Sequence, residues 1–123
     1  MGKSTKEELV KKFADLTLPQ NVREALRAAR ERLSAEFNVD RIVLFGSIVR
    51  GTADEESDVD LLIVLTQPPD HPVRNRISSI ILDINLEHDA NLSGLVVDQN
   101  AWDDGLVSVL PIHEDVEEEG IPL

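Results

Sequence analysis

Apolar side chains recur at helical spacing in two long stretches of the chain and predict its two main helices. The first stretch runs from Pro19 to about Phe37, and its apolar stripe consists of Val22, Leu26, Ala29, Leu33 and Phe37. The second begins near Pro72, which suits the first turn of a helix, and its stripe consists of Val73, Ile77, Ile80, Ile81, Ile84 and His88. Shorter helices are predicted over residues 1–18, where Ser4 and Glu7 have capping-box spacing, and over residues 109–119, which Gly120 and Pro122 end.

Three short apolar runs predict strands, at residues 41–45, 59–65 and 92–97. Gly46 and Ser47 turn the chain after the first run, and a short helix over residues 48–50 ends at Gly51. Because strands alternate with helices, we expect an α/β (α+β) fold with a small mixed sheet flanked by helices. We expect residues 19–123 to form this single domain and residues 1–18 to form an N-terminal helix.

The length and composition narrow the class of protein. A chain of 123 residues suits one hydrophobic core, and it contains no cysteine, which excludes disulfides and thiolate metal sites. No apolar run reaches the length of about 18 residues that spans a membrane, so no membrane partner is expected. The charged N-terminus differs from a signal peptide, so we expect a cytoplasmic protein. Trp102 lies in a stretch rich in Asn, Asp and Gly that reads as a linker, and we expect its ring to cap the core.

The net charge of −12 is divided unevenly along the chain. Residues 1–50 hold ten basic and seven acidic side chains, whereas residues 51–123 hold two basic and seventeen acidic ones. The basic half has no dense cluster of Lys and Arg of the kind that binds a phosphate backbone, so the composition argues against a nucleic-acid partner. Most of these charges are expected to solvate the surface.

Two aspartates stand at the start of the second predicted strand, ten residues after the glycine-serine turn. Because side chains alternate along a strand, Asp58 and Asp60 point to the same side, about 7 Å apart, while Val59 points into the core. Such a pair suits one or two Mg²⁺ ions, which take few protein carboxylates and add water and phosphate oxygens. Gly46 lets the backbone approach a phosphate, and Ser47 adds a hydroxyl donor. The arrangement predicts a site for a metal-bound nucleoside triphosphate.

The stretch LFGSIVRGTADEESDVDLLIVL resembles the Gly-Ser, ten residues, Asp-x-Asp signature of the DNA-polymerase-β-like nucleotidyltransferase superfamily. The short chain resembles the minimal nucleotidyltransferases of that superfamily. The resemblance implies transfer of a nucleoside monophosphate, AMP from ATP in the first instance, to an acceptor hydroxyl. It also implies that Gly46 and Ser47 hold phosphates, that Asp58 and Asp60 bind Mg²⁺, and that Arg50 pairs with a phosphate or an acid.

The superfamily adds a third carboxylate, which serves as ligand and general base, on the strand that follows the next helix. The corresponding strand of this chain contains no acid between Asn91 and Val97. Asp89 stands just before it and Asp98 just after it, and either would need a shift of register to reach the metal. Asp89 is our candidate for the third catalytic carboxylate. Alternatively, Asn91 or Ser93 occupies the place of the acid, and metal and nucleotide bind while proton removal is poor.

Three functions follow from the resemblance and stay open at this point. The first is a Mg²⁺-dependent nucleotidyltransferase that modifies a protein acceptor. The second is an antitoxin that binds an α-helical HEPN-type partner, with or without catalysis, and the third is a catalytically silent nucleotide-binding module. The nucleotide, the acceptor and the oligomeric state, a homo-oligomer included, also stay open. His71 and His113 are expected at the surface, and His88 is expected to pack on the core.

Overall fold

The computed structural model describes residues 13–54 and 57–123, so the predicted capping box at Ser4 and Glu7 lies outside the described residues. Of the predicted N-terminal helix, the described part holds only a short 3-10 helix. The elements in chain order are η1 (Phe13–Asp15), α2 (Gln20–Glu36), β1 (Val39–Phe45), α3 (Ser47–Arg50), β2 (Val59–Leu65), α4 (His71–His88), β3 (Leu92–Asp98), α5 (Gln99–Asp103), η2 (Leu106–Val109), α6 (Pro111–Glu119) and β4 (Ile121–Pro122).

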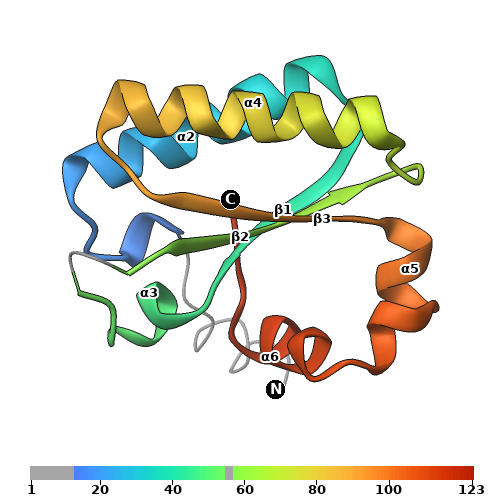
Figure 1. The fold of residues 1–123 in the computed structure, drawn as a ribbon. Helices are drawn as coiled ribbons and strands as arrows, with labels where there is room; N and C mark the ends of the chain where they lie inside the picture. Colours follow the sequence, from blue (N-terminus) through green and yellow to red (C-terminus); the bar gives the residue numbers. More distant parts are fainter. Residues whose placement is uncertain (1–12, 55–56) are drawn as a thin grey trace.

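The strands form one mixed sheet in the order β3-β2-β1-β4, which confirms the predicted fold class (Figure 1). β2 pairs antiparallel with β1 and parallel with β3, and β4 pairs antiparallel with β1. The side chain of Asn85 on α4 donates to the Leu92 carbonyl and accepts from the Leu92 N–H. It thus makes the two backbone hydrogen bonds that a neighbouring strand would make at the start of the edge strand β3. The central strand β2 is almost wholly buried, as its continuous apolar run predicts.

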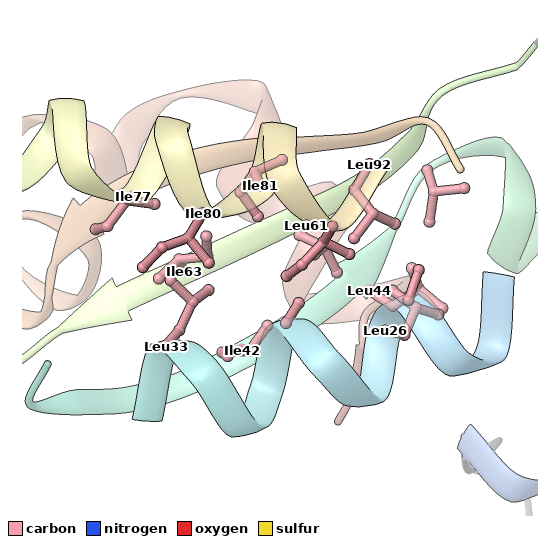
Figure 2. Close-up of a cluster of buried hydrophobic side chains, with 14 of the residues drawn as sticks. Leu26, Leu33, Ile42, Leu44, Leu61, Ile63, Ile77, Ile80, Ile81 and Leu92 are labelled. Atoms are coloured by element: carbon pink, nitrogen blue, oxygen red, sulfur yellow. The ribbon is translucent and has the colours of Figure 1, made fainter. Parts of the chain in front are cut away.

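Helices α2 and α4 cover one face of the sheet and enclose the larger part of the core (Figures 1 and 2). Their predicted stripes meet alternate residues of the strands, and the fully buried members include Leu26, Leu33, Leu44, Leu61, Ile63, Ile77, Ile80 and Ile84. Each such side chain contributes about 1.5–3 kcal/mol through burial. Across the described ranges, no helix combines the length and the apolar character needed to cross a membrane.

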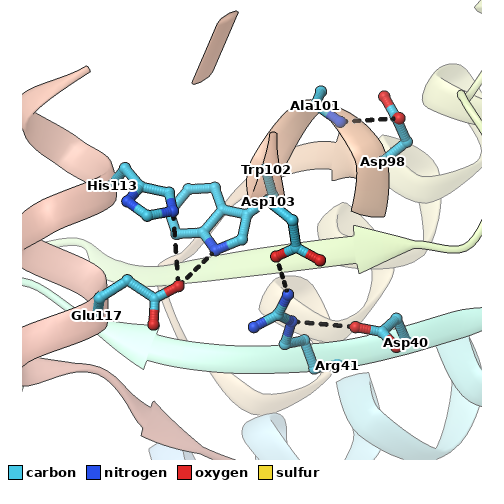
Figure 3. A network of polar contacts seen from close by, with 8 residues as sticks. All are labelled: Asp40, Arg41, Asp98, Ala101, Trp102, Asp103, His113 and Glu117. Atoms are coloured by element: carbon cyan, nitrogen blue, oxygen red, sulfur yellow. Dashed lines mark hydrogen bonds and ion pairs between the residues drawn. The ribbon is translucent and has the colours of Figure 1, made fainter. Parts of the chain in front are cut away.

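The opposite face of the sheet is covered by α5 and α6, where two sequence-based predictions were wrong. Trp102 lies in helix α5 rather than in a linker, and its buried indole caps this second part of the core, as expected of the ring itself. His113 is only partly exposed, because its ring packs 4.5 Å from the Trp102 ring (Figure 3). The Trp102 Nε1–H donates to Glu117 at 3.0 Å, and His113 Nε2 lies 3.6 Å from the same carboxylate. Long-range packing against the sheet decides both positions.

The C-terminal end also differs from the prediction. The last helix begins at Pro111 rather than at residue 109, because the preceding residues form the 3-10 helix η2 and proline suits the first turn of the new helix. Gly120 ends that helix as expected, but the following residues form strand β4, which the sequence pattern did not reveal. Ile121 pairs with Leu44 and is buried, so the chain end is fixed to β1.

Candidate active site

The glycine of the predicted phosphate-binding turn has a conformation that only glycine adopts readily. Gly46 follows the last residue of β1 with φ 85° and ψ −157°, and its carbonyl accepts from the N–H groups of Val49 and Arg50, which begins α3. A Cβ atom at Gly46 would lie 2.4 Å from Oδ2 of Asp60. The backbone of the turn is therefore in direct contact with the predicted metal-binding carboxylate, and the two halves of the motif form one site.

The two aspartates stand where β2 begins. Asp58 directly precedes the strand, and Asp60 pairs across the sheet with Phe45, the residue before the glycine turn. Burial raises the pKa of the Asp60 carboxyl, the charge of Asp58 raises it further, and the charge of Arg50 lowers it. Two carboxylates that repel each other in a partly buried position favour a bound cation, because the cation removes the repulsion.

The register of β3 shows which residue lies beside this pair. Asp60 is directly opposite Ser93, and Val59 is opposite Leu92, so Ser93 and Asp60 are on the same face of the sheet. Asn91, one step earlier on that face, donates its side-chain N–H to Oδ1 of Asp58 at 2.6 Å. A serine and an amide thus flank the aspartates on the β3 side. Whether either of them stands at the place of the third acid stays a prediction.

Asp89 is placed differently from the aspartate pair. It ends α4 in the left-handed conformation with φ 51°, which aspartate tolerates better than most residues. Its carbonyl and that of His88 both accept from the side chain of Asn21, which joins the end of α4 to the start of α2. Over residues 13–54 and 57–123, no three His, Cys, Asp or Glu side chains gather into a metal-binding group. Asp89 therefore has a backbone role, and its catalytic role stays a prediction.

A pocket of about 880 Å³ lies near this end of the sheet, but Gly46, Ser47, Asp58 and Asp60 are not among the residues that line it. Its wall includes Ser57, Val59 and Asn91, which surround Asp58 in the sequence and across the sheet, and also Ile48, which follows the phosphate-binding turn. Asp89 lines the same pocket.

Arg50 ends the short helix after the turn and pairs with an acid, which was one of the two predicted roles. Its Nη1 lies 3.0 Å from Oε2 of Glu119 at the end of α6. The carbonyl of Ser47 accepts from the N–H of Thr52 at 3.0 Å, and Gly51 ends the helix in the left-handed conformation. Sequence reasoning missed Glu119, because it is 69 residues from Arg50 and lies in an acidic run that resembles an ordinary solvated helix face.

The Gly46→Ala variant tests the contact between the turn and Asp60. We expect it to destabilise the fold by about 2–4 kcal/mol, because backbone strain and the collision with Asp60 add up. Gly51→Ala is the matched control, since Gly51 also has a positive φ, 76°, but a Cβ atom there has no neighbour within 4 Å. Urea unfolding of both variants gives the comparison, and adding Asp60→Ala to Gly46→Ala should recover part of the loss. Equal losses in the two glycine variants would contradict this contact.

The raised pKa of Asp60 predicts that a neutral side chain at this position stabilises the metal-free fold, whereas Gly46→Ala destabilises it. Because the folded-state pKa is raised, the stability contributed by Asp60 is present below its unfolded pKa and is lost as the pH rises through the folded pKa. Asp60→Asn imitates the protonated side chain and is expected to raise the melting temperature of the metal-free protein at pH 7. The gain should shrink as the pH falls toward about 4. Thermal unfolding against Asp115→Asn, an exposed carboxylate on α6, checks this, and a lower melting temperature for Asp60→Asn would refute it.

Comparison with known proteins places this chain in a family. The family model described as "Nucleotidyltransferase domain" matches residues 26–119, which include both halves of the site. Protein adenylyltransferase MntA of Thermococcus cleftensis is 43% identical over 57 residues, which are 46% of this chain and 57% of the relative. The chain spans 57–59% of the length of the first curated relatives it matches.

Two solved structures are similar in fold. One is described as a "putative minimal nucleotidyltransferase"; it is 29% identical, with a TM-score of 0.54, over 81% of this chain and 94% of that one. The other is a mutant of the toxin-antitoxin MntA-HpeT, which is 21% identical, with a TM-score of 0.51, over 87% of this chain and 72% of that one. The second likeness concerns the fold alone.

Proposed function

The chain belongs to the nucleotidyltransferase domain family, and from this we propose that it transfers AMP from ATP to a hydroxyl group of a protein acceptor. The observation that carries the proposal is the contact between the Gly46 backbone and the Asp60 carboxylate, which unites a phosphate-binding turn with a cation-binding pair. The name of the similar adenylyltransferase supports AMP as the transferred group and a protein as the acceptor.

The reaction requires that one phosphoester bond forms and one phosphoanhydride bond breaks. The acceptor oxygen bonds to the α-phosphorus, the bond from that phosphorus to the bridging oxygen breaks, and pyrophosphate leaves with the electron pair. Gly46 and Ser47 hold the departing phosphates on the β1 side, which leaves the β3 side, where Ser93 and Asn91 lie, for the acceptor. Ser93 is a poor base, so the acceptor proton passes to water or to a group on the acceptor, and we expect slow transfer.

The donor set at the start of β2 fits Mg²⁺. Asp60 is partly buried and repelled by Asp58, and Asp58 has one oxygen engaged by Asn91 and a second oxygen for a cation. Mg²⁺ takes one or two carboxylates and completes its shell with water and substrate phosphates, so the pair suffices for one ion. When bound, the ion would neutralise charge on the phosphates and orient the α-phosphorus.

The neutral residue beside Asp60 favours a second candidate function, a nucleotide-binding module that acts mainly by binding a partner protein. One similar fold belongs to a toxin-antitoxin complex, which supports a partner chain, and a HEPN-type protein is the class that the sequence resemblance suggests. In this function the site binds Mg-ATP without measurable transfer.

Incubation with ATP labelled on the α-phosphate, Mg²⁺ and the product of the neighbouring gene separates these functions. Label on the partner polypeptide, with release of pyrophosphate, supports the transferase. A tight complex and Mg-ATP binding without label supports the binding module. A chain that binds no Mg-ATP in calorimetry would overturn both functions.

A further inference from the structure

The guanidinium of Arg50 and the carboxylate of Glu119 form an ion pair between two parts of the chain that the sequence separates widely. The atoms Nη1 and Oε2 are 3.0 Å apart, and the side chains are 48% and 40% exposed. An ion pair this exposed contributes little to the stability of a fold. The ion pair therefore matters chiefly for the position in which it holds the Arg50 side chain.

The position of Glu119 is fixed by the close packing of the residues that follow it. A Cβ atom at the following residue, Gly120, would lie 2.4 Å from the Val116 carbonyl and 2.5 Å from a methyl group of Val43 on β1. The next residue, Ile121, is buried and pairs with Leu44, two residues before the Gly46 turn. Glu119 and the phosphate-binding turn are thus both fixed to the same end of β1.

Helix α6 is also anchored through Val116 and Glu117. Val116 is buried, and Glu117 accepts the hydrogen bond from the indole of Trp102 (Figure 3). A helix anchored through Trp102 on one side and through β4 on the other keeps the Glu119 side chain in place before any ligand arrives.

Arg50 lies one helical turn from the predicted phosphate-binding glycine, because its backbone N–H donates to the Gly46 carbonyl at 3.3 Å. A guanidinium has five N–H donors, and the contact with Glu119 uses the Nη1 group, so donors remain for phosphate oxygens. A long, flexible arginine that is already oriented loses less conformational freedom when it binds a phosphate.

We infer that Glu119 is a positioning residue, which holds the Arg50 guanidinium beside the triphosphate of the bound nucleotide. The inference rests on the proposed function, since it requires a nucleotide at the Gly46 turn. It makes the end of the C-terminal helix part of the nucleotide-binding apparatus. The inference predicts that neutralising Glu119 weakens nucleotide binding. Without the positioning role, removing an acid near a triphosphate would be expected to strengthen binding.

The test measures the binding of Mg²⁺ with a non-hydrolysable ATP analogue by titration calorimetry. We expect Glu119→Gln and Glu119→Ala to weaken binding about 3- to 10-fold, which corresponds to the loss of one pre-ordered side chain. Glu118→Gln removes the same charge from the exposed neighbour on the same helix and should leave the dissociation constant unchanged. In the Arg50→Ala background, the Glu119 substitutions should have no further effect.

Each outcome decides the matter. Equal or tighter binding by Glu119→Gln, or an equal loss in Glu118→Gln, would overturn the positioning role while the proposed function stands. A loss that persists undiminished in the Arg50→Ala background would also overturn it, because Glu119 would then act without Arg50. If the unaltered protein binds no Mg-nucleotide, the proposed function fails and the inference fails with it. Thermal unfolding of each variant shows whether the fold is retained, and Glu119→Asp, which keeps the charge, should restore part of the affinity.

Discussion

Replacing Asp58 or Asp60 with asparagine is expected to reduce AMP transfer by about 10³-fold or more, because the proposed Mg²⁺ site would supply several kcal/mol of transition-state stabilisation. Both side chains would contact the same ion, so the double variant should be little worse than either single one. The measurement is transfer of label from α-labelled ATP, with single-turnover rates where the signal allows.

The structure provides an internal control for this result. Asp60→Asn is expected to make the metal-free fold more stable, so its loss of transfer would not reflect misfolding. We expect Mg²⁺ to raise the melting temperature of the unaltered protein and to have no such effect on this variant. Asp115→Asn, which alters an exposed carboxylate in the middle of α6, should behave as the unaltered protein in both assays. Transfer at the ordinary rate by Asp60→Asn would exclude the proposed metal site.

Introducing an acid at Ser93 is expected to increase transfer. The register places Ser93 directly opposite Asp60 on the neighbouring strand, where a carboxylate could accept the acceptor proton and join the metal shell. A well-placed general base accelerates reactions about 10²- to 10⁴-fold, so an imperfectly oriented Ser93→Asp should gain about 10- to 100-fold. A third negative charge should at the same time lower the melting temperature of the metal-free protein and increase the stabilisation by Mg²⁺.

Two control variants test whether the gain requires a negative charge and whether it requires that charge at residue 93. Ser93→Asn has a similar shape without the charge and should give no gain. Asn91→Asp adds the same charge at the other candidate position, but it replaces the N–H that donates to Asp58 with a carboxylate that repels it, so we expect a loss. A Ser93→Asp protein that binds Mg-ATP and transfers no faster than the original would show that the acceptor, not this chain, governs proton removal.

Much of this fold could be predicted from the sequence because its signals are local. The stripe from Val22 to Leu33 and the run from Val59 to Leu65 specify a helix and a strand through the spacing of their own apolar side chains. Gly46 and Gly51 mark positive φ angles, and Pro72 marks the first turn of α4, each through the backbone preference of a single residue.

The errors concern residues whose environment comes from distant segments. Trp102 is surrounded by turn-forming residues, yet its indole is buried against the sheet and bonded to Glu117 on another helix. The two residues of β4 are too few to show any periodicity, and they form a strand only because β1 offers a free edge. Nothing within these short segments distinguishes them from loops.

The sequence by itself determined the two main helices, the three longer strands and the pairing of a glycine-serine turn with Asp58 and Asp60, since each depends on neighbouring residues and on alternation along a strand. Only the tertiary structure decided that Ser93 lies beside Asp60 and that Glu119 reaches Arg50. The reason is physical: a strand's register and a helix's docking result from packing many side chains at once. A shift of one residue would turn Ser93 to the other face of the sheet without altering any local pattern.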